Sequence, residues 1–443
     1  MLTGTVTVGN VSIGANSPVK VQTMCNTFTQ DIEKSVAQCE EMVATGADLI
    51  RLTTQGMKEV EALKEIKSIL RSRNIDVPLI ADVHFSSDVA IEVAKVADKV
   101  RINPGNFAKD HDEACRQLKK FLEVCKKYGT AVRIGVNHGS LGERIINKYG
   151  DTPLGMKEAA MEWIRMCEEN DFHNLVISLK ASNTIVMATA YRLLWKEMEE
   201  RSRIYPLHLG VTEAGNGDTG RIKSAVGIGA LLKDGIGNTI RVSLTEDPVK
   251  EIPAGKIIAR YFDSGEYAES IHRIGEITPG CIPHNNYDCQ CWDEFIIKAS
   301  CDFGPMLLDK EIDDFTLTAR IGGEEIPQEK IDDFKDNLQQ AARRKFNKPE
   351  YIACPGCGRT LYNLEETFNE VKRRTSHLKG VKIAIMGCIV NGPGEMADAD
   401  FGYVGEGKGK VAIYKGKEPV LRSVPQEEAI DQLLRIIEEN PLE

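Results

Sequence analysis

Residues 78–105 read PLIADVHFSSDVAIEVAKVADKVRINPG, and they contain the pattern on which the fold prediction rests. Two short apolar runs, PLIADVH (78–84) and KVRINPG (99–105), flank a stretch with helical periodicity. Six further runs repeat this pattern along the chain: VKVQTM (19–24), DLIRLT (48–53), AVRIGVNHG (131–139), LVISLKAS (175–182), PLHLGVTEAG (206–215) and NTIRVSLT (238–245). Eight strand–helix repeats predict an α/β fold, the TIM (β/α)8 barrel. A doubly wound open sheet is the alternative, although no glycine-rich dinucleotide fingerprint follows the first strand.

Composition narrows the class of protein. A chain of 443 residues is long enough for two or three domains. The formal net charge of −10 argues against a nucleic-acid-binding protein with a general basic face. No apolar run approaches the roughly 20 residues of a membrane span, and the N-terminus MLTGTVTVGNVSIG lacks a secretory signal pattern. We therefore expect a cytoplasmic protein that binds neither nucleic acid nor membrane.

Cations occur near the C-terminal ends of the predicted strands, where a strand buried on both faces should be apolar. They are Arg51, Arg101, Arg133, Lys180 and Arg241. Alternation places Arg101 and Asn103 on one face of their strand and the apolar neighbours on the other. The same parity pairs Arg51 with Thr53, Arg133 with Asn137, and Arg241 with Ser243. If the apolar face packs against helices, these polar side chains point toward the barrel axis at the rim where barrel enzymes have active sites.

This ring of cations indicates a ligand. A single strand-end arginine is ordinarily a structural ion-pair partner, but five converging cations would repel one another in a partly dry cavity. Guanidinium groups bind phosphate oxygens in a bidentate fork, so the barrel mouth is predicted to bind a small diphosphate. Asp82, His84 and Glu213, also at strand ends, are candidate proton-transfer groups.

The chain contains twelve cysteines, which should not form disulfides in a reducing cytosol. Those in segments with helical periodicity are expected to be plain core or surface residues: Cys39, Cys115, Cys125 and Cys167.

The cysteines of the C-terminal region have a different pattern. From about residue 346 the sequence predicts an α+β domain with cysteines at the ends of two strands, in YIACPGCGRT (351–360) and AIMGCIVNGPGE (384–395). Cys354 and Cys357 have a metal-binding spacing around a Pro-Gly turn. Cys388 precedes a tight turn that brings back Glu395, the candidate fourth ligand.

Three chemistries remain open for this group. Three thiolates with one replaceable carboxylate suit an iron–sulfur cluster that exposes one iron to substrate. A zinc site is the rival, although structural zinc is usually completed by Cys or His. Unligated cysteines in turns are the third possibility.

Longer motifs identify a family. ACPGCGRT, GCIVNGPGE, RINPGN, RIGVNHGSL and GVTEAG together resemble the (E)-4-hydroxy-3-methylbut-2-enyl diphosphate synthase (HMBPP synthase) family of the methylerythritol phosphate pathway of isoprenoid biosynthesis. The resemblance covers residues 1–264 and 346–443. It implies a TIM barrel joined to a [4Fe–4S] domain. It also implies reductive ring opening of 2-C-methyl-D-erythritol 2,4-cyclodiphosphate with loss of water, with electrons from reduced flavodoxin or ferredoxin.

The resemblance also assigns residues. The implied cluster ligands are Cys354, Cys357, Cys388 and Glu395. The implied diphosphate-binding residues are Arg51, Arg101, Arg133, Asn137, Lys180, Arg241 and Ser243. Glu213 matches the acidic residue near the substrate, where we predict that it protonates the departing oxygen. Asp82, His84 and Asn103 match further residues of the barrel mouth, which we include in the substrate-binding set.

Residues 265–345 depart from the simplest family pattern, giving three predicted regions: a barrel (1–264), a spacer (265–345) and a cluster domain (346–443). CWDEFIIKASCDFGPMLLDKEIDDF looks like the end of an insertion found in plant-like members, here shortened to a small helical spacer. Its cysteines lack a matching ligand set, so no second metal is expected: Cys281, Cys289, Cys291 and Cys301. We expect a homodimer, with a preference for an active site shared between subunits.

Two rival functions remain. One is another barrel enzyme with a phosphorylated substrate, such as a pterin-binding synthase, carrying a structural zinc domain. The other is an iron–sulfur scaffold or electron carrier without a substrate, which would have no use for the barrel cations. The basic segment 371–382 is a candidate dock for an electron donor, although a solvated helix end is the preferred interpretation.

Overall fold

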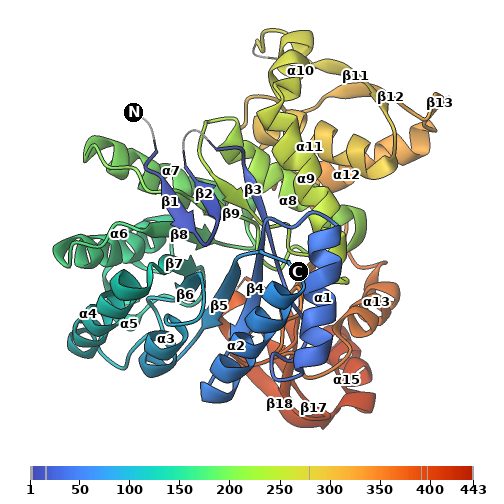
Figure 1. Cartoon of the computed structure of the whole chain (residues 1–443). Coiled ribbons are helices and arrows are strands. Elements are labelled where there is room, and N and C mark those ends of the chain that lie inside the picture. Colours follow the sequence, from blue (N-terminus) through green and yellow to red (C-terminus); the bar gives the residue numbers. More distant parts are fainter. Residues whose placement is uncertain (1–2, 15–16, 279, 391, 397, 442–443) are drawn as a thin grey trace.

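The computed structural model describes residues 3–14, 17–278, 280–390, 392–396 and 398–441 (Figure 1). A ring of parallel strands forms its centre: β3 (Lys20–Met24), β4 (Leu49–Thr54), β5 (Leu79–Val83), β6 (Lys99–Ile102), β7 (Ala131–Asn137), β8 (Leu175–Lys180), β9 (His208–Leu209) and β10 (Thr239–Ile240). Their order is β8-β7-β6-β5-β4-β3-β10-β9, and a parallel bridge between Ile177 and Leu207 joins β8 to the start of β9. The sheet is thus closed, so the TIM barrel is confirmed and the open doubly wound sheet is not found.

Helices surround the barrel (Figure 1). They are α1 (Ile32–Ala44), α2 (Met57–Ser72), α3 (Ser87–Val93), α4 (His111–Tyr128), α5 (Glu143–Tyr149), α6 (Pro153–Glu169), α7 (Thr184–Glu200), α8 (Gly217–Leu232), the 3-10 turn η1 (Pro248–Lys250) and α9 (Glu251–Asp263). The helix α4 shows how the sequence sets the two ends of a helix. Asp110 caps its first turn, and Gly129 ends it with φ of +71°. Leu118, Phe121 and Leu122 form its buried face. No helix in the described part of the chain is long and apolar enough to cross a membrane.

A short hairpin closes the bottom of the barrel. It consists of β1 (Val6–Val8) and β2 (Val11–Ile13), which pair in antiparallel fashion. Its apolar side chains pack against the lowest inward-facing residues of the strands, including Leu49, Ile80 and Ala131. This apolar floor leaves the opposite rim as the open end.

The region 265–345 packs on the barrel and is more than a helical spacer. It contains α10 (Glu266–Ile274), β11 (His284–Cys289), α11 (Trp292–Leu308), β12 (Thr316–Ile321), β13 (Glu324–Glu325) and α12 (Gln328–Ala341). The strand β11 runs parallel to β12, and β13 is antiparallel to it. The prediction of a helical spacer therefore missed a three-stranded sheet, although β11 has the alternating burial of a half-exposed strand.

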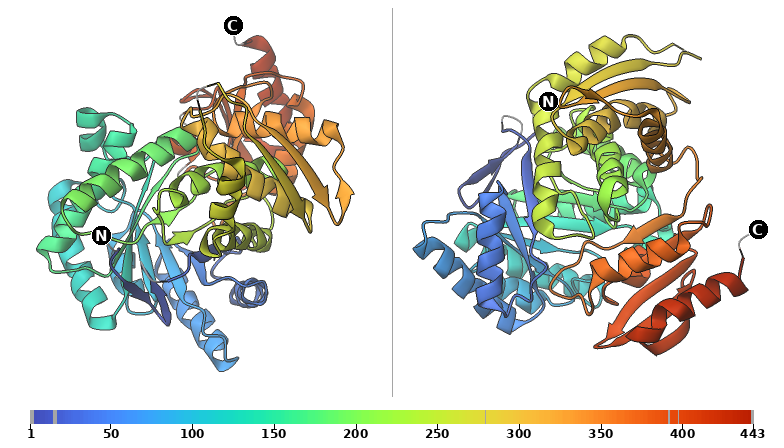
Figure 2. Two further views of the ribbon diagram at one scale, coloured as in Figure 1. Left: turned by 90° about the horizontal axis from the view of Figure 1, so that it is seen from above. Right: turned by 90° about the vertical axis from the view of Figure 1, so that its right-hand side faces the viewer.

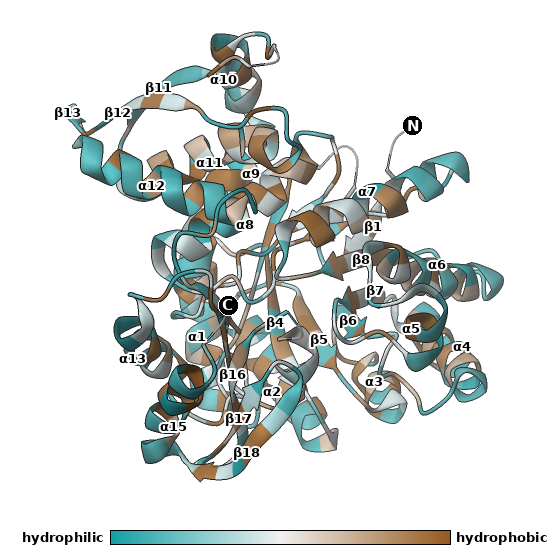
Figure 3. Cartoon of the chain, turned by 180° about the vertical axis from the view of Figure 1, so that it is seen from behind, coloured by the Kyte–Doolittle hydropathy of each residue, from teal (hydrophilic) through white to brown (hydrophobic). Residues whose placement is uncertain are grey.

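Tight packing fixes this region to the barrel. The helix α11 lies along α8, and Gly229 of α8 approaches Cys301 so closely that an added β-carbon would be 3.3 Å from its sulfur. The carboxylate of Asp302, also on α11, accepts hydrogen bonds from Tyr261 of α9 (2.9 Å) and Tyr287 of β11 (2.7 Å). Figure 3 shows α11 as largely apolar and the outer helix α12 as largely polar. The barrel and this region consequently share one hydrophobic core.

The C-terminal region forms a separate α/β layer (Figure 2). Its elements are β14 (Glu350–Ala353), α13 (Leu364–Thr375), β15 (Lys382–Met386), α14 (Gly392–Glu395), β16 (Phe401–Gly407), β17 (Lys410–Lys415), β18 (Glu418–Pro425) and α15 (Gln426–Glu439). The five strands follow the order β14-β15-β16-β17-β18, with the first three parallel. The predicted α+β domain is found, with β16 and α14 as additions to it.

This domain closes over the barrel of its own chain. Ala353 forms a parallel bridge with Ala214 of the barrel, and the Thr245 hydroxyl donates to the Cys354 carbonyl oxygen at 2.9 Å. The backbone at Gly394 approaches Gly139 so closely that a β-carbon there would collide with the Gly139 carbonyl oxygen. The cysteines therefore reach a barrel mouth without a second subunit, contrary to the preference for sharing between subunits.

A buried ion pair stabilises this closure and makes it sensitive to pH. Lys223 Nζ of α8 lies 3.0 Å from Glu350 Oε1 at the start of β14, and Arg343 Nη1 lies 2.6 Å from Glu350 Oε2. Burial alone would raise the pKa of Glu350, but Lys223 and Arg343 outweigh it and lower the pKa from 4.5 to about 2. Because the folded-state pKa is depressed, the stabilisation is complete above the unfolded-state pKa and is lost as the pH falls toward 2.

We expect Glu350→Gln to lower the free energy of unfolding by about 3 kcal/mol at neutral pH, the equivalent of this pKa difference. Urea unfolding measures the effect, and the gap between wild type and variant should shrink from about pH 5 to pH 3. The control is Glu370→Gln, which removes an exposed pair with Arg373 and should change little. A gap that does not change with pH would show that the Glu350 charge is not its source.

Candidate active site

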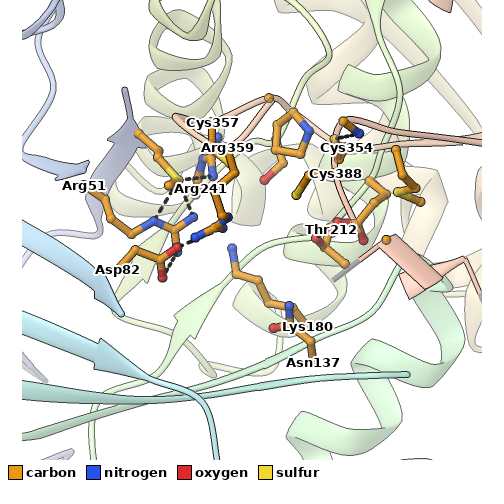
Figure 4. Close-up of a pocket in the computed structure, with 18 of the residues that line it drawn as sticks. Arg51, Asp82, Asn137, Lys180, Thr212, Arg241, Cys354, Cys357, Arg359 and Cys388 are labelled. Carbon is orange, nitrogen blue, oxygen red and sulfur yellow. Dashed lines mark hydrogen bonds and ion pairs between the residues drawn. The ribbon is translucent and has the colours of Figure 1, made fainter. Parts of the chain in front are cut away.

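The cavity between the barrel mouth and the C-terminal domain brings together most of the predicted site residues. The predicted residues that line it are Arg51, Asp82, Arg101, Arg133, Asn137, Lys180, Glu213, Arg241, Ser243, Cys354, Cys357 and Cys388. Figure 4 shows Lys180 and Asn137 on the barrel side and the three cysteines on the opposite side. The lining also includes Met24, Thr212 and Arg359, which the sequence analysis did not single out.

Asp82, at the end of β5, is the centre of a charge network. Its Oδ1 lies 3.2 Å from Arg101 Nη1 and 3.8 Å from Arg51 Nη1. Its Oδ2 lies 3.4 Å from Arg359 Nη2. Burial alone would raise the pKa of Asp82, but Arg51 and Arg101 outweigh it and lower the pKa well below the usual value. Asp82 is thus an ionised anchor that orients arginines and is a poor proton donor, contrary to its prediction as a proton-transfer group.

Arg101 crosses the barrel because a neighbouring strand makes room for it. It donates to the Gly135 carbonyl oxygen of β7 at 3.0 Å. A β-carbon at position 135 would collide with Arg101 Nε, so only glycine fits there. The glycine of RIGVNHGSL thereby permits the arginine of the adjacent strand to lie across it.

Two predicted residues lie behind the cavity wall. His84 Nε2 contacts Arg101 Nη1 at 2.5 Å, and burial followed by Arg101 lowers the pKa of His84 to about 3. Asn103 donates to Ser140 Oγ and accepts from the Gly105 backbone N–H, which shapes the loop after β6. Neither residue lines the cavity. They support the site, and His84 is uncharged at neutral pH.

Arg241 is held by a residue that the sequence analysis missed. Its Nε and Nη2 donate to the two carboxylate oxygens of Glu251 in α9, at 3.0 and 2.9 Å. Glu251 also accepts from the Leu244 backbone N–H at 3.1 Å. The pair is buried, with Arg241 2% and Glu251 1% exposed. One of the five predicted cations is thus neutralised and rigidly positioned.

Arg133 and Lys180 lack such partners in the described part of the chain. No described group accepts from Arg133 Nε or Nη1, and Lys180 forms no ion pair with a described carboxylate. Burial, followed by neighbouring cations, lowers the pKa of both groups well below their usual values. Among the described residues, six cationic side chains line the cavity, against the carboxylates of Asp82 and Glu213 in the lining and that of Glu251, which pairs with Arg241. This excess of buried positive charge favours a multiply charged anion as ligand.

Glu213 lies on the loop that follows β9. It adopts φ of +49°, in the left-handed region that is uncommon for residues other than glycine. The Thr212 hydroxyl donates to Glu213 Oε1 at 2.6 Å, and the residue is 2% exposed. The loop therefore brings a carboxyl group to the lining of the cavity that the cations and the cysteines share.

The opposite wall carries the cysteines. Cys354 follows β14, Cys357 lies three residues further along the same turn, and Cys388 follows β15. The Gly387 backbone N–H donates to Cys354 Sγ at 3.2 Å, an interaction that favours sulfur with negative charge. Adjacent parallel strands β14 and β15 thus deliver three sulfurs to one cavity.

The donors on this wall are of a kind that fits an iron–sulfur cluster, because such clusters are held by cysteine thiolates. Three described cysteines, Cys354, Cys357 and Cys388, line the one cavity. Glu395 is the last residue of α14, and its side chain is outside the part of the structure described. Its prediction as fourth ligand stays a prediction.

Arg359 connects the two walls of the cavity. It follows Cys357 by two residues and reaches down to Asp82 of the barrel, and its side chain is 9% exposed. Burial alone would lower the pKa of Arg359, but Cys357, Asp82 and Cys388 raise it above the usual value. No described group accepts from its Nε or Nη1. The motif GCGRT places this arginine two residues after Cys357, and that proximity to a candidate metal ligand could have indicated it from the sequence.

The other cysteines lie away from the cavity. Cys39, Cys125 and Cys167 are buried in the core and Cys115 is exposed, as predicted. Within the region 265–345, Cys289 and Cys301 are buried, Cys281 is partly exposed and Cys291 is exposed.

Known proteins resemble the chain along almost its whole length. The GcpE TIM-barrel domain matches residues 3–256, and the GcpE protein C-terminal domain matches residues 350–439. A protein of Prochlorococcus marinus named 4-hydroxy-3-methylbut-2-en-1-yl diphosphate synthase (ferredoxin) is 42% identical, with 99% of this chain and 93% of that protein covered. A protein of Phocaeicola vulgatus named 4-hydroxy-3-methylbut-2-en-1-yl diphosphate synthase (flavodoxin) is 37% identical, with 98% of this chain and 97% of that protein covered. The latter alignment spans 598 positions, more than the 443 residues here, so that relative contains segments that this chain lacks.

Solved structures are similar to part of the chain. Dihydropteroate synthase from Stenotrophomonas maltophilia is 14% identical with a TM-score of 0.43, and the match covers 60% of this chain and 98% of that one. At this level the likeness carries no argument about function.

Proposed function

The chain belongs to the GcpE family of 4-hydroxy-3-methylbut-2-en-1-yl diphosphate synthases, and we propose that its activity takes place in the cavity between the barrel cations and the three cysteines. The substrate that we propose is 2-C-methyl-D-erythritol 2,4-cyclodiphosphate, opened and dehydrated with two electrons. The observation that supports this most strongly is the meeting of six cations and three cysteines on one cavity. Neither a structural zinc domain nor an electron carrier without a substrate accounts for both walls.

The barrel wall would bind the diphosphate. Arg51 and Arg101 are oriented by Asp82, and Arg241 is oriented by Glu251, so their guanidinium planes are fixed before the ligand enters. Arg133 offers N–H groups without described acceptors, and Lys180 offers an amine without a described carboxylate partner. Phosphate oxygens would replace the missing partners and relieve repulsion among the cations. Asn137 and Ser243, which line the same wall, would add neutral hydrogen bonds.

The cysteine wall would hold the cofactor. Cys354, Cys357 and Cys388 would bind three irons of a [4Fe–4S] cluster, and the resemblance alone supports Glu395 as the fourth ligand. Such a cluster would supply electrons one at a time and Lewis-acid chemistry. A carboxylate such as that of Glu395 would hold its iron less firmly than a thiolate does.

Glu213 would supply a proton to the oxygen that departs as water. It lines the same cavity as the cations and the cysteines, and its backbone is held in the left-handed region. Glu213→Gln keeps the shape and removes the acid, so we expect kcat to fall by about 100-fold with a smaller change in KM. Steady-state assays at several pH values measure this.

The matched control is the same Glu-to-Gln change at an exposed position away from the cavity. Glu143→Gln, at the start of α5 on the barrel exterior, should leave kcat unchanged. Normal turnover by Glu213→Gln would remove the proton-donor role while leaving the rest of the proposal intact.

A reduced flavodoxin or ferredoxin would deliver the electrons, since the relatives are named for one or the other. In the basic segment 371–382, Arg373 pairs with Glu370 and Arg374 pairs with Asp431, which reduces the positive charge available for docking. A solvated helix end therefore remains the simpler explanation of that segment. We also propose a homodimer, which gel filtration of the purified chain tests.

The activity is tested by incubating anaerobically purified protein with the cyclic diphosphate and a chemically reduced flavodoxin or ferredoxin. Phosphorus NMR should show the ring diphosphate signals replaced by those of a linear diphosphate. A colourless protein without iron that needs no reductant would instead favour the zinc-domain alternative.

A further inference from the structure

A buried polar cluster lies beneath the proposed diphosphate site, inside the barrel. Lys99 begins β6 at the level of the apolar floor, since it pairs in register with Ile80 and Ala131. Arg101, two residues on, shares its inward face and reaches the cavity. The Lys99 side chain therefore starts from the floor and extends upward inside the barrel.

Lys99 has no described hydrogen-bond partner although it is completely buried. Its exposed fraction is 0%, and no described group accepts from its Nζ. Burial, followed by the neighbouring cations Arg133 and Arg51, lowers the pKa of Lys99 well below the usual value. A buried ammonium without an acceptor costs far more than a buried neutral amine.

The groups that face Lys99 are predominantly cationic. The charges that act on Lys99 are those of Arg133 on β7 and Arg51 on β4, and Lys99 itself acts on His208 of β9. Arg101, two residues further along its own strand, has the same inward direction. Asp82 is occupied by Arg101, Arg51 and Arg359, and Glu251 by Arg241. His208 Nε2 also lacks a described partner, and burial followed by Lys180 lowers the pKa of His208 well below the usual value. No described carboxylate is thus left to pair with Lys99.

We propose that Lys99 is an internal charge-compensating residue of the diphosphate site, and that it takes up a proton from solvent when the cyclic diphosphate enters the cavity. The inference rests on the proposed function, because the ligand supplies the negative charge. In the free enzyme Lys99 is a neutral amine below a layer of arginines. The diphosphate above Arg133 and Arg51 reverses the sign of the local field, and the amine becomes an ammonium.

A residue that compensates negative charge is also needed during the reaction, because ring opening increases the charge of the ligand. Each phosphorus of the cyclic diphosphate carries one ionised oxygen, and opening the ring creates a terminal phosphate with a further ionisable oxygen. The site must therefore tolerate more negative charge after ring opening than before. Lys99 does not touch the substrate; it is a positioning residue that acts through Arg133 and the field of the site.

If Lys99 takes up a proton when the ligand binds, the dissociation constant must depend on pH. A ligand that increases proton affinity binds more tightly when protons are available, and the coupling is reciprocal. Between the pKa of Lys99 in the free enzyme and that in the complex, the dissociation constant should rise about tenfold for each unit of pH. A structural lysine with a fixed charge would give no such slope.

Isothermal titration calorimetry measures the proton directly. The holoenzyme is titrated anaerobically with the cyclic diphosphate, without an electron donor, in buffers of different ionisation enthalpy. At about pH 8, above the ordinary histidine range, we expect wild type to take up protons on binding, about one of them per ligand at Lys99. The cyclic ligand does not itself titrate in this range, because its phosphorus oxygens are strongly acidic.

The decisive comparison is Lys99→Met, which removes the amine and keeps the length of the side chain. We expect this variant to take up about one proton fewer per ligand than wild type and to show a dissociation constant that rises less steeply with pH. The control is Lys67→Met, which removes a lysine paired with Asp98 on the outside of the barrel and should retain the wild-type uptake. Lys99→Gln is the second variant if the methionine protein does not fold.

Each outcome separates this inference from the proposed function. Binding without proton uptake in wild type, or equal uptake in wild type and Lys99→Met, overturns the role of Lys99 alone. No binding of the cyclic diphosphate overturns the proposed substrate itself. Carbon NMR of wild type labelled at lysine Cε tests the same point without a variant: one lysine signal should move to its protonated position when ligand is added, and an unchanged spectrum of the saturated protein contradicts the proposal.

Discussion

Replacing Cys388 with serine should abolish turnover, with kcat reduced by at least about a thousandfold, because the three cysteines act as a unit. Cys388 follows β15, and the loss of its sulfur leaves only Cys354 and Cys357 on the cavity wall. Two ligands on one turn would not retain a cluster firmly. The iron content of the anaerobically purified variant and its rate with reduced flavodoxin measure the two parts of this prediction.

Cys115→Ser is the matched control. Cys115 is exposed on α4, away from the cavity, and its substitution should leave both iron content and rate unchanged. Circular dichroism of both variants shows whether the fold is kept, which is expected because Cys388 is partly exposed and lies in a loop. Full activity of Cys388→Ser would rule out the cysteine wall as the cofactor site.

Replacing Arg359 with methionine should lower kcat/KM by about 100-fold, the equivalent of nearly 3 kcal/mol of transition-state stabilisation. Arg359 links the cysteine turn to Asp82 and offers donors without described acceptors to whatever occupies the cavity. Global stability should change little, because Asp82 keeps its contacts with Arg101 and Arg51. The variant would therefore lose the contact that orients the cysteine turn relative to the barrel, and it would lose one positive charge in the cavity. Its fold would be kept.

Arg373→Met serves as its control, since Arg373 is an exposed arginine of the same domain that pairs with Glu370. Its effect on kcat/KM should be within experimental scatter. A threefold or smaller effect of Arg359→Met would mean that Arg359 has no part in binding or catalysis, and that its contact with Asp82 only attaches the domains.

Strand parity was enough to predict most of the barrel wall from sequence. In VRIN, alternation separates the face of Arg101 from the face of Val100, and the same argument placed Arg51, Arg133 and Arg241 on the cavity. Parity gives the face of a strand, but it does not say whether a neighbour covers the side chain. His84 and Asn103 share the predicted face of their strands, yet neither lines the cavity; His84 contacts Arg101, and Asn103 donates to Ser140.

Other parts of the site depend on contacts between distant segments. Glu251 belongs to the helix after β10, and nothing local indicates that it forms two hydrogen bonds with Arg241. Closure of the C-terminal domain over its own barrel depends on Lys223 and Glu350, which are 127 residues apart in the chain. Such pairings arise from packing of whole domains, so local periodicity does not predict them.

The region 265–345 shows how a local pattern was misjudged. The run HNNYDC in β11 alternates exposed and buried residues, which is typical of a strand with one solvent face. The acidic run and the periodic apolar residues of the following segment, which includes α11, are typical of helices and predict only a helical spacer. Burial of α11 against α8 explains why that helix is apolar on most of its surface.

Electron paramagnetic resonance of the reduced protein, before and after addition of the cyclic diphosphate, tests the central claim most directly. The claim is that cations of the barrel place the ligand against a cluster bound by cysteines of the same chain. The account predicts that saturating substrate changes the signal of the reduced wild-type protein, and that Lys180→Met requires more substrate for the same change. A signal that stays unchanged while calorimetry shows the site to be full would contradict it.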